Sequence, residues 1–139
     1  MGQKLLLSAI IIAIAFIWGH SLVPMDMSAQ ESGWITEHII APVLALFGVD
    51  EVSTHLVRKI AHVGEFLILA LLVYAYLRGR VLKGFYVCFT VAFLDESIQL
   101  LSGRGSLISD VWVDLIGVVI GIVVCKVFTI IFGMKHERK

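Results

Sequence analysis

Three strongly apolar runs in this chain each carry charged or amide side chains close to one end. The runs cover residues 60–77, 84–101 and 111–132. Because a carboxylate is costly to bury near hydrocarbon, such residues are candidates for function. The polar residues near these ends, with one arginine in the turn before the third run, are Lys59, His62, Glu65, Asp95, Glu96, Gln99, Arg104, Asp110 and Asp114.

The apolar content indicates a bilayer as the solvent of this protein. Hydrophobic residues make up 59% of the 139 residues, whereas a soluble domain is usually about half apolar or less. A surface of that composition would aggregate in water. The net charge is zero and no basic stripe occurs, so nucleic acid is excluded as an expected partner.

The chain is predicted to be an all-α membrane protein, a four-transmembrane-helix bundle that forms a single domain over residues 1–139. The expected spans are 5–22, 60–77, 84–101 and 111–132, each near the ~20 residues that cross a bilayer. A signal peptide is the alternative for the first span. No clean small-x-small cleavage site precedes His20, so a retained helix is favoured.

An outer segment, residues 23–58, separates the first two spans. Apolar residues recur at helical spacing over 35–47 and predict an amphipathic helix, bent near Pro42. The helix is too short to span. It is expected to lie on the membrane surface or to dip back into it, and a packed cap over the bundle is an equal alternative.

The basic residues predict the orientation, with both termini in the cytoplasm of a multi-pass protein of the cell membrane. With the amino terminus inside, seven basic residues outside the spans lie on the cytoplasmic side and three on the outer side. The inner seven are Lys4, Arg78, Arg80, Lys83, Lys135, Arg138 and Lys139, and the outer three are Arg58, Lys59 and Arg104.

In this orientation the polar ends of the three runs lie at one depth near the outer face. Asp110 and Asp114 are one turn apart, and Gly117 and Gly121 continue their helix face as a GxxxG pattern. Small residues let helices approach closely, so this face should point into the bundle, or join two chains as an oligomer. Asp95 is not assigned to the cluster, since it can equally face another helix.

Carboxylates that are held this close repel one another. Some should therefore be protonated, paired with Lys59, His62 or Arg104, or bound to a cation. A structural interpretation also stands for each residue: an interior hydrogen bond for His62, interface anchoring for Lys59 and Arg104, and a bond between helices for Gln99. No cofactor is predicted, and a divalent cation at the carboxylate cluster is left open.

From Arg58 to Gly121 the chain resembles the VanZ-like family, small membrane proteins named after a teicoplanin-resistance protein. The likeness rests on Lys59-x-x-His62, on Glu96-x-x-Gln99, and on a set that opens and continues the fourth span: Arg104, Ser109, Asp110 and Gly117. The family commonly has asparagine where this chain has Asp114. The resemblance implies a multi-pass envelope protein linked to glycopeptide antibiotics, and it implies no agreed reaction.

An enzyme acting on a lipid-linked envelope precursor at the outer leaflet is the first functional hypothesis. Glu65 and Glu96 are the expected acid–base pair, with His62 and Asp110 orienting them. The expected substrate-binding residues are Lys59, Gln99, Arg104, Ser109 and Asp114, in which the two cations suit a phosphate. A non-catalytic binder or modulator is the close alternative. A transporter is disfavoured, because the inner halves of the helices carry few polar groups.

Overall fold

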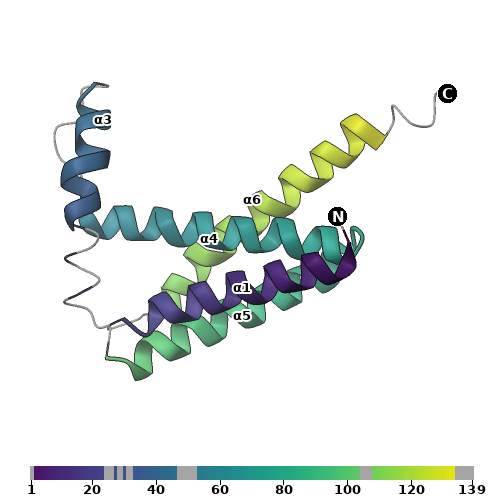
Figure 1. The fold of residues 1–139 in the computed structure, drawn as a ribbon, viewed down its shortest axis with the longest axis horizontal. Helices are drawn as coiled ribbons and strands as arrows, with labels where there is room; N and C mark the ends of the chain where they lie inside the picture. Colours follow the sequence, from purple (N-terminus) through teal and green to yellow (C-terminus); the bar gives the residue numbers. More distant parts are fainter. Residues whose placement is uncertain are drawn as a thin grey trace.

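Helices make up nearly all of the described chain, and no strand occurs in it. The structure, a computed structural model, describes residues 2–23, 27, 30, 33–46, 53–103 and 108–133, apart from the side chains at 43, 44, 108 and 133. The long helices are α1 (Gln3–Ser21), α4 (Thr54–Tyr76), α5 (Val81–Leu101) and α6 (Ile108–Gly133) (Figure 1). The prediction of an all-α chain is confirmed.

All four long helices begin earlier than the predicted spans, and two of these beginnings have a clear local cause. Ser53 caps α4, and its hydroxyl accepts a hydrogen bond from the backbone N–H of His55 at 3.2 Å. Such a cap satisfies one of the unpaired N–H groups of the first turn, so the helix extends through the basic residues before Ile60. The start of α6 at Ile108 likewise places Asp110 in its first turn, where a carboxylate complements the helix dipole.

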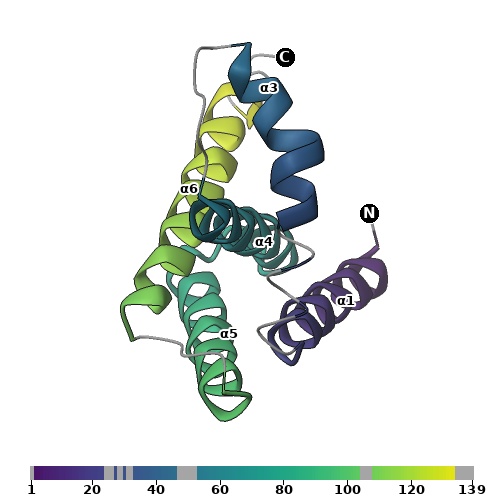
Figure 2. The same ribbon diagram turned by 90° about the vertical axis from the view of Figure 1, so that its left-hand side faces the viewer.

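The long helices run antiparallel in sequence order, with α4 and α5 in the middle. At one end, Gln3 Nε2 of α1 donates to the carbonyl oxygen of Tyr76 at 3.5 Å. At the other end, Ser21 of α1 contacts Asp95 of α5. Figure 2 shows α1 and α6 on opposite sides of α4 and α5. The carboxyl-terminal ends of α1 and α5 therefore lie beside the amino-terminal ends of α4 and α6.

The tightest packing joins α4 to α6, which is the most extensive helix pair of the described chain. A Cβ atom added at Gly117 would overlap the carbonyl oxygen of Val63, and one at Gly121 would lie 2.8 Å from the carbonyl oxygen of Leu67. Both glycines thus face α4 of the same chain. Association of two chains through them, which the sequence left open, stays a prediction.

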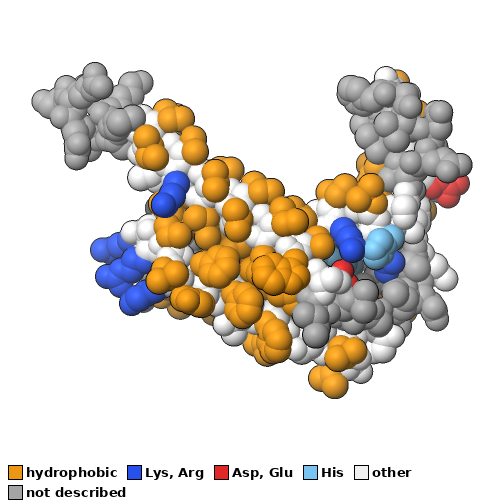
Figure 3. Space-filling model, turned by 180° about the vertical axis from the view of Figure 1, so that it is seen from behind, with side chains coloured by type: hydrophobic (Ala, Val, Ile, Leu, Met, Phe, Trp, Pro, Cys, Tyr) orange, Lys and Arg blue, Asp and Glu red, His pale blue; other side chains and the backbone are white. Residues whose placement is uncertain are grey.

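The described surface is rich in large exposed hydrophobic side chains on every long helix. Examples with more than half of their surface exposed are Ile12, Phe16, Ile60, Phe93 and Trp112. Figure 3 shows hydrophobic side chains covering the middle of one face, with lysine and arginine at one edge and again beside a histidine toward the other end. The helix Gln3–Ser21 and the stretch Ser109–Phe132 of α6 are long and apolar enough to cross a membrane.

A separate helical segment lies between α1 and α4 and stands away from the bundle in Figure 1. It contains a π-helical turn, η1 (Thr36–Ile40), followed directly by α3 (Ala41–Ala45). Its exposed hydrophobic side chains are Trp34, Ile35, Ile39 and Leu46. These four side chains are exposed, whereas Ile40 is partly buried, and the choice between a surface helix and a packed cap stays a prediction. Phe47, the last residue of the predicted helix, lies outside the described residues.

Candidate functional site

Polar side chains from α1, α4, α5 and α6 converge at one end of the bundle. We call this set the polar cluster, and its members are His20, Ser21, His62, Glu65, Asp95, Glu96, Gln99 and Asp114. Asp95 and Asp114 have exposed fractions of 0% and 1%, and Glu96 and Gln99 are also buried. The antiparallel order of the helices brings these groups together, because the polar residues lie near the end of α1 and α5 and near the beginning of α4 and α6.

Asp95 is the hydrogen-bonding centre of the cluster. Its Oδ1 accepts a bond from Ser21 Oγ at 2.6 Å, and its Oδ2 accepts one from Gln99 Nε2 at 2.9 Å. Gln99 Nε2 also lies 3.4 Å from Glu96 Oε1. Two buried partners orient the Asp95 carboxylate, and the bond from Ser21 ties the end of α1 to α5. Hydrogen bonds of this charge-assisted kind are stronger than neutral ones.

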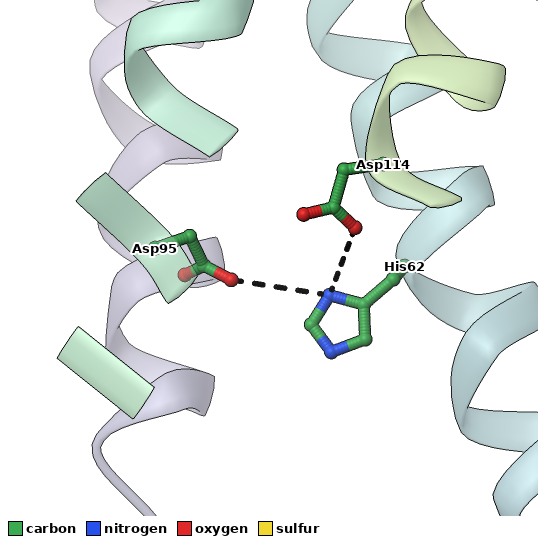
Figure 4. A group of neighbouring side chains, drawn as sticks. All are labelled: His62, Asp95 and Asp114. Carbon is green, nitrogen blue, oxygen red and sulfur yellow. Dashed lines mark ion pairs between the residues drawn. The ribbon is translucent and has the colours of Figure 1, made fainter. Parts of the chain in front are cut away.

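The His62 imidazole lies among three carboxyl groups. Its Nδ1 is 3.7 Å from Asp114 Oδ1, 3.8 Å from Glu65 Oε2 and 4.0 Å from Asp95 Oδ2. Figure 4 shows His62, Asp95 and Asp114 pointing toward one another from three helices, with Nδ1 turned toward both aspartates. The three distances exceed the 2.7–3.2 Å of a hydrogen bond. The three carboxyl groups therefore surround Nδ1 of His62 at distances longer than a hydrogen bond.

Glu65 and His20 form the more accessible side of the cluster. Their ion-pair distance is 3.7 Å between His20 Nδ1 and Glu65 Oε1, and their side chains are 25% and 15% exposed for His20 and Glu65 respectively. The rings of His20 and His62 lie 6.0 Å apart between centroids. A molecule reaching the cluster would therefore meet Glu65 and His20 before the buried aspartates.

A further ion pair lies beside this cluster. Lys59 Nζ lies 3.3 Å from Asp110 Oδ1, and both side chains are partly exposed. This pair joins the beginnings of α4 and α6. Ser109 is exposed, and no described contact joins it to the cluster. Arg104 lies outside the described residues. Of the predicted site residues, the structure thus brings together His62, Glu65, Glu96, Gln99 and Asp114.

Sequence reasoning missed three members of the cluster. His20 and Ser21 close the first apolar run, at the same end of the bundle as the other polar groups. The orientation predicted from the basic residues places both of them at this end. Asp95 is four residues before Gln99, the spacing that puts two side chains on one helix face. That spacing was the available signal.

An all-helical protein with an apolar surface and a buried polar cluster at one end is the class that this fold defines. The chain belongs to the VanZ/LLP1 family, whose sequence model matches residues 6–129. Family membership and the two apolar helices together point to a membrane protein, and the VanZ relationship suggests a protein of the cell envelope related to glycopeptide resistance. No curated protein and no solved structure matches the chain.

Proposed function

We propose that this chain is a multi-pass envelope protein that acts by acid–base chemistry on a lipid-linked or glycosylated substrate at the outer leaflet. The observation that carries the proposal is the polar cluster, with carboxyl groups and imidazoles from four helices within an otherwise apolar bundle. Polar groups at that depth are expensive, and they are usually retained for function. All four long helices are taken as spans, with both termini in the cytoplasm.

Within the cluster we assign the acid–base roles to Glu65 and Glu96. Glu65 lies on the accessible side, and its Oε2 is 3.8 Å from His62 Nδ1, so the imidazole can share a proton with it. Glu96 is held by Gln99 at 3.4 Å. Lys59 at the mouth of the bundle suits a phosphate group, because its partly exposed ammonium, which pairs with Asp110, can form charge-assisted hydrogen bonds to an anion. The apolar helix surfaces suit a polyprenyl or acyl tail.

Replacing Glu96 with glutamine should abolish the resistance that the chain confers on a glycopeptide-sensitive host. The amide keeps the size of the side chain and its acceptor oxygen for Gln99 but cannot exchange a proton, and general acid–base groups contribute ~10²–10⁴-fold to rate. The measurement is the minimal inhibitory concentration of teicoplanin at matched protein levels in the membrane. Glu37→Gln on the exposed outer segment is the matched control, and full resistance with Glu96→Gln would remove the enzyme proposal.

A non-catalytic binder or modulator is the second candidate, and the exposed hydrophobic side chains of the outer segment favour it. Trp34, Ile39 and Leu46 are exposed apolar side chains that can insert in the membrane or dock on an envelope enzyme. Under this alternative, deletion of residues 35–47 should abolish resistance while Glu65→Gln and Glu96→Gln keep part of it. If the chain is an enzyme, Glu65→Gln and Glu96→Gln should abolish resistance and the deletion should leave part of it. The same susceptibility assay therefore separates the enzyme from the binder.

A further inference from the structure

We propose that His62, Asp95 and Asp114 bind a divalent transition-metal cation, with Zn²⁺ as the preferred ion. One ligand atom from each residue, the imidazole nitrogen and two carboxylate oxygens, lies within 4.8 Å of the other two. The three side chains come from α4, α5 and α6 and point toward a common space (Figure 4). The inference deepens the proposed function, on whose site it rests, by naming what that site holds.

The distances leave room for an ion between the three groups. Nδ1 of His62 is 3.7 Å from Asp114 Oδ1 and 4.0 Å from Asp95 Oδ2. Two ligands of a tetrahedral zinc, each ~2.0–2.1 Å from the metal, lie about 3.3 Å apart. Small side-chain rotations therefore bring the three atoms into coordination range, whereas a direct hydrogen bond would have drawn one pair closer.

A second observation concerns the remaining oxygen of Asp114. Asp114 Oδ2 is buried and accepts no hydrogen bond within the described residues, and Asp114 is only 1% exposed. A carboxylate oxygen in such a place costs free energy unless a hydrogen bond or a cation satisfies it. Gly117, one turn later, holds this part of α6 against the α4 backbone, so the carboxylate stays beside His62.

The surrounding hydrogen bonds are those that a metal ligand needs. Asp95 accepts from Ser21 at 2.6 Å and from Gln99 at 2.9 Å, and such outer partners fix the direction in which a ligating carboxylate points. An imidazole ligand favours Zn²⁺ over Mg²⁺ or Ca²⁺, which prefer oxygen alone. Three protein ligands leave one coordination position open, the arrangement of catalytic zinc sites, and Glu65 remains beside it for acid–base work.

Metal binding can be tested on the full chain without a polyhistidine tag, purified in detergent, treated with chelator and titrated with Zn²⁺. We expect about one zinc per chain, measured by mass spectrometry of the metal and by competition with a fluorescent chelator. Asp114→Asn and His62→Asn should each weaken zinc binding at least about tenfold. Glu37→Gln and His55→Asn, which remove an exposed carboxylate and an exposed imidazole, should leave it unchanged.

Zinc should also raise the unfolding temperature of the wild-type chain and not that of Asp114→Asn, since a ligand stabilises the state that binds it. If a variant fails to fold, the effect of zinc on the unfolding temperature of the wild-type chain still tests the site. An unfolding temperature that zinc leaves unchanged, or equal zinc affinity in a folded Asp114→Asn chain, would overturn the site. The site would also be overturned if Glu37→Gln and His55→Asn weakened zinc binding as much as Asp114→Asn does.

The outcomes also separate this inference from the proposed function. If zinc does not bind but Glu96→Gln abolishes resistance, the acid–base proposal stands and the metal site is wrong. If zinc binds at the three residues but Asp114→Asn and Glu96→Gln keep full resistance, the metal site stands and the proposed enzyme is wrong. Mg²⁺ and Ca²⁺ serve as comparison ions, and binding as tight as that of Zn²⁺ would contradict the assigned ligand set.

Discussion

Replacing Gly117 with alanine should lower the free energy of unfolding of the bundle by more than about 3 kcal/mol. The added Cβ atom would overlap the carbonyl oxygen of Val63 and would lie 3.1 Å from the backbone nitrogen of Leu67. Both obstacles are backbone atoms of α4, so no side chain can rotate away to make room. The helices must separate, and overpacking of this kind costs ~1–3 kcal/mol or more.

Gly64→Ala on the facing helix is the matched control for this variant. An added Cβ there meets no atom within 4 Å, and alanine exceeds glycine in helix propensity by ~1 kcal/mol. Gly64→Ala should therefore be neutral or stabilising. The measurement is reversible unfolding in mixed micelles, followed by circular dichroism. Equal stabilities for the two variants would contradict the close approach of α4 and α6.

The same close approach has a consequence for the polar cluster. Gly117 lies one turn after Asp114, and Val63 is the residue next to His62. The distance between the two helix backbones therefore sets the distance between the imidazole and the carboxylate. A Gly117→Ala chain that still folds should bind zinc more weakly than the wild type, although Gly117 touches no ligand, because the two side chains move apart with their helices.

The sequence predicted the helical class and the end of the bundle at which the polar groups meet. Both depend on local patterns: long apolar runs, and charges at the same end of three of them. The helix α4 begins more than a turn before the predicted span, since the apolar run begins at Ile60 whereas the cap at Ser53 starts the helix. A single capping hydroxyl outweighs hydrophobic periodicity in deciding where a helix starts.

Partner choice inside the cluster could not be predicted, because it depends on the crossing geometry of the helices. Spacing shows that Asp95 and Gln99 share a face, but it does not show that Ser21 of α1 faces them. The same limit applies to the ion pair between Asp110 and Lys59, at 3.3 Å, and the orienting role of Asp110 stays a prediction. The packing of α4 against α6 at the glycine contacts decides which polar side chains lie next to one another.

Replacing Asp95 with alanine should lower the free energy of unfolding by about 3 kcal/mol, even with excess chelator present to remove metal effects. The loss leaves the buried hydroxyl of Ser21 without its acceptor, at ~1–3 kcal/mol for an unsatisfied group. It also takes from Gln99 Nε2 its shortest hydrogen bond, at 2.9 Å, and leaves only the longer contacts to Glu96 and Ser21. Asp95→Asn keeps an acceptor oxygen for Ser21 Oγ and should cost less. Ser97→Ala, which removes a hydroxyl bonded to the α5 backbone at Phe93, should change stability by less than ~0.5 kcal/mol.

A double-mutant cycle isolates the contact between α1 and α5. Because Ser21 Oγ and Asp95 Oδ1 are 2.6 Å apart and both side chains are buried, Ser21→Ala and Asp95→Ala should be non-additive, with a coupling of ~1–3 kcal/mol. Ser97→Ala combined with Asp95→Ala should show additive losses. If the Ser21 and Asp95 variants also add, α1 is not fastened to the cluster by this bond.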